Sequence, residues 1–175
     1  ITSIFEPKDV YSGLNIDPEV SIQTVNNVVF YLQTLKAPIQ RNQNDTKVIS
    51  GKKIFVEIGC EKCHKETLTT GFSPVEVLSN KTFHPYTDLL LHDMGSALND
   101  GYTEGSATTA EWRTPALWGL GLSPNSQGGQ YFLMHDGRAH TIDDAILLHG
   151  GEANPSKKRF NQLSDTEKEA ILKFL

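Results

Sequence analysis

The chain has 175 residues, a hydrophobic share of 38%, a charged share of 21% and a net charge of −5. This length is enough for one domain with a substantial core, and the composition is that of an ordinary, mildly acidic globular protein. The sequence has no basic stripe that could replace counterions on phosphates, which excludes nucleic acid as a partner. No apolar run approaches the ~20 residues that cross a bilayer, so a membrane span is excluded as well.

The first part of the chain predicts one helix and then a linker. From Asp17 to Leu35, Asp17 can cap the helix, Pro18 suits its first turn, and apolar residues recur with the helical period. Residues 41–50 are polar and show no period, which is typical of a linker. We therefore expect a domain boundary in this stretch.

A second helix is predicted from near Ser50, with Ile54, Phe55 and Ile58 on one side and Gly59 ending it. The middle of the chain, residues 66–128, is rich in Gly, Ser, Thr and Pro and has little periodicity. A region with so few secondary-structure signals is either organised by another component or disordered. We expect loops and short helical turns wrapped around a group that is not protein.

Two further helices are predicted near the end of the chain. Thr141 can cap a short helix over residues 143–149 that ends at the Gly150–Gly151 pair. Ser164 and Glu167 form the S-x-x-E capping pattern ahead of an apolar run that reaches Leu175. The helix before Cys60 is expected to cross this last helix.

The stretch EIGCEKCHKETL contains the only two cysteines of the chain. Cys60 and Cys63 are three residues apart, and His64 follows directly. The C-x-x-C-H pattern is typical of covalent attachment of a c-type haem. Each thiol can form a thioether with the haem, and the histidine can bind the iron from one side.

Three other interpretations of the motif remain open. A structural zinc site needs four ligands and would have to recruit distant histidines. A thioredoxin-like dithiol calls for a strand-to-helix context that the flanking residues do not show. A disulfide between Cys60 and Cys63 would close a trivial loop and would leave His64 unexplained.

The sixth position of a haem iron decides its chemistry, because methionine raises the reduction potential, histidine lowers it, and an open site admits peroxide. The chain has two methionines, Met94 and Met134. Met94 precedes Gly95 in a predicted loop that is far enough downstream to return over the haem, so it is the preferred ligand. His92 is its competitor, and Met134 is a third candidate.

Several motifs occur in one order: GKKIFVEIGCEKCH, YTDLLLHDMG, EWRTPALWGLG and LMHDGRAHTIDDAILLHGGEA. Together they resemble the C-terminal haem domain of the di-haem oxidoreductases, often called thiol oxidoreductases, which are related to the bacterial di-haem cytochrome c peroxidases and MauG. The resemblance implies a mostly α, cytochrome c-like haem domain with long loops. It also implies one covalent haem c that receives electrons, with Cys60, Cys63, His64 and Met94 at the haem-binding positions.

The resemblance further implies an N-terminal haem domain where peroxide reacts, but the sequence has no second C-x-x-C-H. We therefore interpret residues 1–45 as the closing helix of that preceding domain plus a linker, and residues 46–175 as the haem domain. Its partner is the preceding domain or a separate redox protein.

The resemblance also implies a calcium ion, which the relatives hold between domains, and Asp93 and Asp136 are candidate ligands for it. Because thioethers form after export, the periplasm or another exported location is expected.

Four more side chains are candidates for the haem surroundings. Arg113 and Arg138 could pair with haem propionates, since a guanidinium fork suits carboxylates; surface ion pairs are the alternative. Trp112 and Trp118 could line the haem pocket, although core packing is the commoner role for a tryptophan.

The sequence thus predicts a domain that transfers one electron at a time, with the protein supplying ligation and burial and with no catalytic side chain. It would be the electron-accepting half of a di-haem, peroxidase-like oxidoreductase. One alternative is an enzyme that reduces peroxide at this iron, with His92 as its acid and base. The other is a zinc-stabilised binding module.

Overall fold

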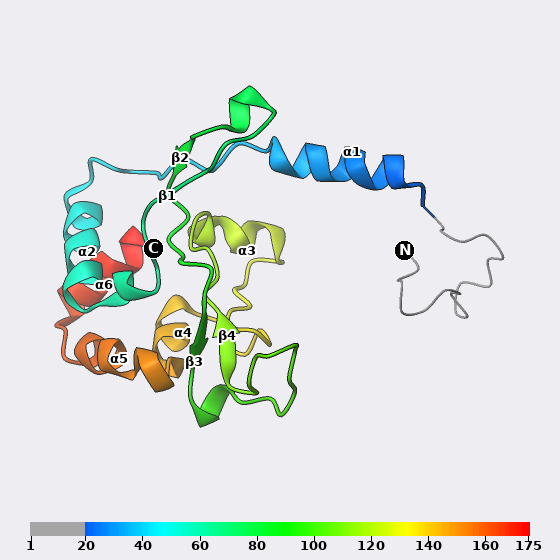
Figure 1. Ribbon diagram of the computed structural model, residues 1–175. Coiled ribbons are helices and arrows are strands. Elements are labelled where there is room, and N and C mark those ends of the chain that lie inside the picture. Colours follow the sequence, from blue (N-terminus) through cyan, green and yellow to red (C-terminus); the bar gives the residue numbers. More distant parts are fainter. Residues whose placement is uncertain (1–19) are drawn as a thin grey trace. The chain divides into compact units, whose positions relative to one another are not determined.

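The computed structural model describes residues 20–175 (Figure 1). These residues divide into two compact units, one made of residues 20–36 and 70–81 and the other of residues 37–69 and 82–175. Helices dominate, with a few strands of two or three residues. The mostly α prediction is confirmed at this level, whereas the cytochrome c-like arrangement and the boundary at residue 45 stay predictions.

The first unit contains helix α1 (Ile22–Gln33) and a loop with the 3-10 turn η2 (Glu76–Leu78). Ser21 caps α1 by accepting a hydrogen bond from the Thr24 amide. The predicted helix is therefore present, but among the described residues it begins at Ile22. Asp17 and Pro18, the predicted cap and first turn, lie outside the described residues.

The second unit begins with helix α2 (Thr46–Glu57), which Asp45 caps through the Lys47 amide at 2.8 Å. The predicted start near Ser50 is wrong, because the helix already begins at Thr46. Its cap, Asp45, lies inside the stretch 41–50 that the sequence indicates as a linker. The predicted end is confirmed. Gly59 has a φ of +89°, which turns the chain out of the helix immediately before the 3-10 turn η1 (Cys60–Lys62).

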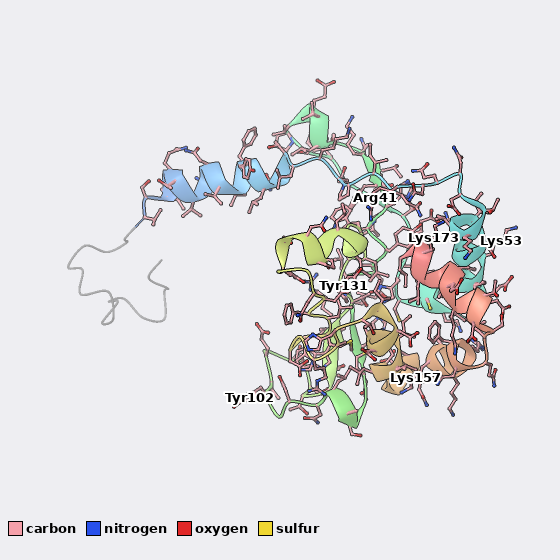
Figure 2. The ribbon with its side chains drawn as sticks, turned by 180° about the vertical axis from the view of Figure 1, so that it is seen from behind. Arg41, Lys53, Tyr102, Tyr131, Lys157 and Lys173 are labelled. Atoms are coloured by element: carbon pink, nitrogen blue, oxygen red, sulfur yellow. The ribbon has the colours of Figure 1, made fainter. Side chains whose placement is uncertain are left out.

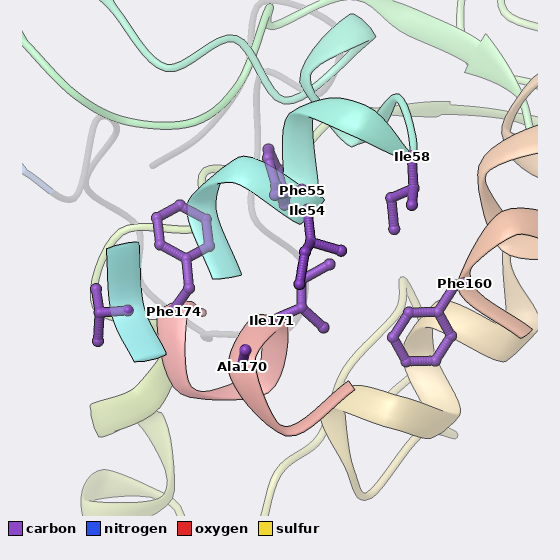
Figure 3. Packing of buried hydrophobic residues seen from close by; sticks show 8 residues of the cluster. Ile54, Phe55, Ile58, Phe160, Ala170, Ile171 and Phe174 are labelled. Carbon is purple, nitrogen blue, oxygen red and sulfur yellow. The ribbon is translucent and has the colours of Figure 1, made fainter. Parts of the chain in front are cut away.

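Helix α6 (Asp165–Phe174) packs against α2, as predicted, and the two lie side by side in Figure 1. The Ser164–Glu167 capping box is present in full. Figure 2 shows the same helices from behind, with Lys53 on α2 and Lys173 on α6. Their facing sides and one residue of a neighbouring helix form the main hydrophobic core (Figure 3), which consists of Val48, Ile54, Phe55, Ile58, Phe160, Ala170, Ile171 and Phe174.

Helix α4 (Ile142–Leu148) is also confirmed, with Thr141 accepting from the Asp144 amide at 3.0 Å. The turn η5 (Gly151–Ala153) and helix α5 (Asn154–Asn161) follow and were not predicted. Helix α5 supplies Phe160 to the core, and its Arg159 donates to the Ile58 carbonyl at 3.2 Å. That bond satisfies one of the free carbonyls at the end of α2.

The middle of the chain is mostly loop, as predicted, but it also contains two small antiparallel ribbons. One pairs β1 (Leu68–Thr69) with β2 (Thr82–Phe83), and the other pairs β3 (Leu91–Asp93) with β4 (Glu111–Arg113). The remaining elements are the turns η3 (Ser96–Leu98) and η4 (Leu120–Leu122) and the short helix α3 (Ser123–Ser126). The β3 strand lies against η5 and so brings two distant segments together.

Candidate haem-attachment site

The C-x-x-C-H motif forms one tight turn at the end of α2. The Cys63 and His64 amides both donate to the Cys60 carbonyl, the latter at 3.0 Å. Both cysteines are free thiols and partly exposed. Two thiols and one imidazole therefore leave a single turn that directly follows a packed helix, which gives them a rigid base.

The His64 ring is fixed from behind. Its Nδ1 donates to the Tyr86 carbonyl at 3.0 Å, so Nε2 carries the lone pair in the neutral ring. The Phe55 ring lies 6.3 Å away, centre to centre, and ties the imidazole to the core. Burial lowers the pKa of His64 to about 4, so the ring is neutral at neutral pH. A neutral imidazole with Nδ1 bound to a backbone carbonyl is the usual form of a metal-binding histidine.

The two thiols do not have the character of a reactive dithiol. Burial raises the pKa of Cys60 to about 12, and burial together with the Asp88 carboxylate raises the pKa of Cys63. Redox-active cysteines need a lowered pKa, because the thiolate is the nucleophile. The structure therefore argues against the dithiol interpretation.

The motif does not form a zinc site with its neighbours either. Within residues 20–175, the one group of potential metal ligands is Cys63, Asp88 and His92, whose ligand atoms lie within 4.8 Å of one another. That group omits Cys60 and His64 and offers three ligands, whereas a structural zinc site uses four. The complete C-x-x-C-H motif thus fits haem attachment better than zinc.

His92, the predicted competitor for the iron, lies between two carboxylates. Its Nε2 is 2.9 Å from Asp88 Oδ2, and its Nδ1 is 3.0 Å from Glu152 Oε2. Carboxylates only accept, so both ring nitrogens act as donors here. The hydrogen bond to Glu152, and after it the one to Asp88, raises the pKa of His92. While these bonds hold, His92 has no lone pair for iron or for a proton.

The two methionines lie in different loops. Met94 directly follows β3, is partly buried, and donates its amide to the Ala110 carbonyl at 2.9 Å. Its main chain runs beside Gly150 so closely that a Cβ on that glycine would lie 2.5 Å from the Met94 carbonyl oxygen. Met134 is partly buried and has an unusual φ of +68°. Iron ligation by either methionine stays a prediction.

His149, which the sequence patterns do not single out, lies close to His64. The ring centre of His149 is 6.5 Å from that of His64, and the two ring planes are inclined by 49°. His149 Nδ1 donates to the Ala145 carbonyl at 2.7 Å, and burial lowers its pKa. The sequence does give one signal, because the capped helix that ends at Gly150–Gly151 fixes where His149 stands.

The two predicted propionate-binding arginines differ in their surroundings. Arg138 donates from Nε to Asp136 at 2.6 Å and from Nη1 to the Ala97 carbonyl at 2.9 Å. Arg113 is exposed at the end of β4. A role of either arginine at a propionate stays a prediction.

The tryptophans and the proposed calcium ligands also have protein partners. Trp112 donates to the Leu98 carbonyl at 2.9 Å and stacks on His135 with 3.7 Å between ring centres. The ring centre of Trp118 lies 5.8 Å from that of Phe83. Asp93 accepts from the Gly95 amide at 2.7 Å, and the Arg138 guanidinium, together with a backbone amide bond, lowers the pKa of Asp136. None of these contacts decides their predicted roles.

Comparison with known proteins gives two matches. A family model described as "Di-haem oxidoreductase, putative peroxidase" matches residues 5–175. A structure of Kuenenia stuttgartiensis hydrazine synthase under xenon pressure matches with a TM-score of 0.55 and 20% identity, over 88% of this chain and 55% of that one. This chain therefore spans about half the length of that neighbour, and the likeness concerns the fold. No curated protein matches, and no helix of residues 20–175 is long and apolar enough to cross a membrane.

Proposed function

This chain belongs to the di-haem oxidoreductase family, and from that premise we propose that residues 46–175 bind one haem c for one-electron transfer. Cys60 and Cys63 would attach the haem, and His64 would be an axial ligand of its iron. The observation that carries this proposal is the orientation of His64, whose Nδ1 is held by the Tyr86 carbonyl directly beside two free thiols.

The chain's own part in this function is to hold and orient the axial ligand. The Tyr86 carbonyl selects the tautomer that presents Nε2, and Phe55 anchors the ring to the core. When bound, haem would supply an iron that alternates between the ferric and ferrous states. No side chain of the site has to gain or lose a proton for that change.

The family name implies a second haem, and the sequence has one attachment motif. We therefore place the second haem in another domain or in a partner protein, with the present domain passing electrons to or from it. Covalent attachment requires maturation outside the cytoplasm, so we place the mature protein in the periplasm or an equivalent exported compartment.

The first test is a denaturing mass measurement after export in a host with a haem-attachment system. The expected mass is that of the chain plus one haem. The double variant Cys60→Ala/Cys63→Ala should lose the added mass, whereas Lys62→Ala, at the exposed position between the cysteines, should keep it. A colourless wild-type protein without added mass would overturn the proposal.

The second test separates a carrier from a peroxide-reducing enzyme. A carrier should reduce and reoxidise reversibly in a potentiometric titration, and its ferric spectrum should stay unchanged when peroxide is added. Rapid spectral change with peroxide, followed by turnover with an electron donor, would establish the enzyme instead. His92→Ala would then show whether that histidine takes part, because only the enzyme needs an acid and base.

A further inference from the structure

His64 and His149 are held in the same way although they come from distant segments of the chain. Each donates from Nδ1 to a backbone carbonyl, at 3.0 Å to Tyr86 and at 2.7 Å to Ala145. Each therefore keeps the lone pair on Nε2, which has no hydrogen-bond partner among residues 20–175. In that part of the chain, every fully buried side-chain nitrogen or oxygen has a hydrogen-bond partner. The two Nε2 atoms have none, so neither of them is fully buried. Both nitrogens thus border open space.

The separation of the two rings matches one particular coordination geometry. Imidazole nitrogens bind metals at about 2.0–2.1 Å, and the nitrogen lies about 1.1 Å from its ring centre, so ligands on opposite sides of one ion have centres about 6.3 Å apart. Ligands at a right angle would bring the centres to about 4.5 Å by the same geometry. The observed 6.5 Å agrees with opposite sides.

The segment after His149 is held at one position by close backbone contacts. A Cβ on Gly150 would lie 2.5 Å from the Met94 carbonyl oxygen, and a Cβ on Gly151 would lie 2.0 Å from that of Asp93. Glu152 then accepts from the Asp93 amide at 3.0 Å and from His92 Nδ1 at 3.0 Å. We call residues 150–152 the glycine latch, because they join the end of α4 to β3.

We propose that His149 is the second axial ligand of the haem iron, opposite His64, and that the glycine latch positions it. This inference rests on the proposed function, since it concerns the same haem. His149 thus takes the sixth position that the sequence predicts for Met94. The main chain of Met94 lies next to the glycine latch, close to the end of α4. The consequence is a lower reduction potential than methionine would give.

Spectroscopy of the haem-loaded protein decides between the two ligands. The wild type should be low-spin and should lack the methionine-to-iron charge-transfer band. His149→Ala should become high-spin and regain the low-spin spectrum when free imidazole is added. His149→Met should remain low-spin, gain the charge-transfer band and shift to a higher potential. Met94→Leu should leave the spectrum and the potential unchanged.

His140→Ala is the matched control, because His140 is exposed and its Nδ1 also pairs with a backbone carbonyl, that of Tyr131 at 3.0 Å. It should keep the wild-type spectrum. If His149→Ala does not mature, the wild-type spectrum and Met94→Leu still decide between a histidine and a methionine ligand, and His149→Met, by its charge-transfer band, identifies the position. A wild-type charge-transfer band that Met94→Leu abolishes would overturn the inference, and so would a high-spin wild type. Either result leaves the proposed haem attachment intact, whereas absence of covalent haem would refute the proposed function itself.

Discussion

At the scale of single residues, Gly151 shows how closely the latch is packed. Its φ is +47°, and a Cβ there would meet the Asp93 carbonyl oxygen at 2.0 Å and the Gly95 amide nitrogen at 2.7 Å. We expect Gly151→Ala to lower the free energy of unfolding by well over 1 kcal/mol, because the left-handed conformation alone costs about 1 kcal/mol and the clash adds to it. Urea unfolding of the haem-loaded protein measures the loss.

Gly119→Ala separates the cost of the left-handed conformation from the cost of the steric clash. Gly119 has a φ of +74° and open space around its Cβ position, so its substitution should cost the conformational term of about 1 kcal/mol only. The haem spectrum gives an independent reading. Gly151→Ala should add a high-spin component because His149 is displaced, and Gly119→Ala should not. Equal stability losses with unchanged spectra in both variants would show that the latch does not position a ligand.

The residues of the site could be predicted from the sequence only where they are neighbours in the chain. Cys60, Cys63 and His64 share one turn, so their spacing alone shows their common purpose. The partners that fix them come from far away, since the Tyr86 carbonyl is 22 residues from His64 and Glu152 is 60 residues from His92. A single sequence carries no signal of such pairs. For the same reason the sequence does not single out His149 as a candidate ligand.

At the scale of elements, the contact between α2 and α6 depends on Gly51. A Cβ there would lie 2.0 Å from the Ala170 carbonyl oxygen and 2.8 Å from the Phe174 Cβ. Helix propensity alone predicts that Gly51→Ala stabilises the protein by about 1 kcal/mol. The packing predicts the opposite sign, a loss of about 1–3 kcal/mol, because the helices must separate. Thermal or urea unfolding decides the sign, and a stabilised variant would contradict this helix contact.

The capping box of α6 gives a second test at this scale. Ser164 Oγ accepts from the Glu167 amide, and the Glu167 carboxylate accepts from the Ser164 amide at 2.8 Å. Ser164→Ala should lower the free energy of unfolding by about 1 kcal/mol, whereas Ser164→Asp, which keeps an acceptor at the cap, should lose much less. Equal losses in the two variants would mean that the side-chain volume matters rather than the cap.

Elements were predictable where a cap and an apolar period agreed, as for α4 and α6. Helix α5 was missed because its sequence NPSKKRFN carries one buried apolar residue, Phe160, and so shows no period. The ribbons were missed because strands of two or three residues are too short for an alternating pattern. The start of α2 was misplaced because the Asp45 cap stands in a polar stretch without other helix signals.

At the scale of the whole molecule, acid should destabilise the fold. Hydrogen bonds and cationic neighbours lower the pKa of five carboxyl groups, those of Asp45, Asp88, Asp136, Glu152 and Glu167. The unfolded chain therefore binds these protons first as the pH falls, and stability rises with pH in that range. The contribution is complete well above the ordinary values of 3.8 and 4.5, and it is lost as the pH falls through the lowered values.

Asp45 tests this directly, because it pairs with Lys173 at 2.5 Å and so joins the first turn of α2 to the last turn of α6. Asp45→Asn keeps a good helix cap but removes the titrating group. Its free energy of unfolding, measured in urea between pH 7 and pH 3, should fall less steeply than that of the wild type. Lys173→Met should flatten the curve less, because the Lys47 amide still lowers the pKa of Asp45 in that variant. Lys173→Met should change nothing further in the Asp45→Asn protein, because the titrating partner is already gone. An unchanged slope in Asp45→Asn would assign the acid sensitivity to the other carboxylates.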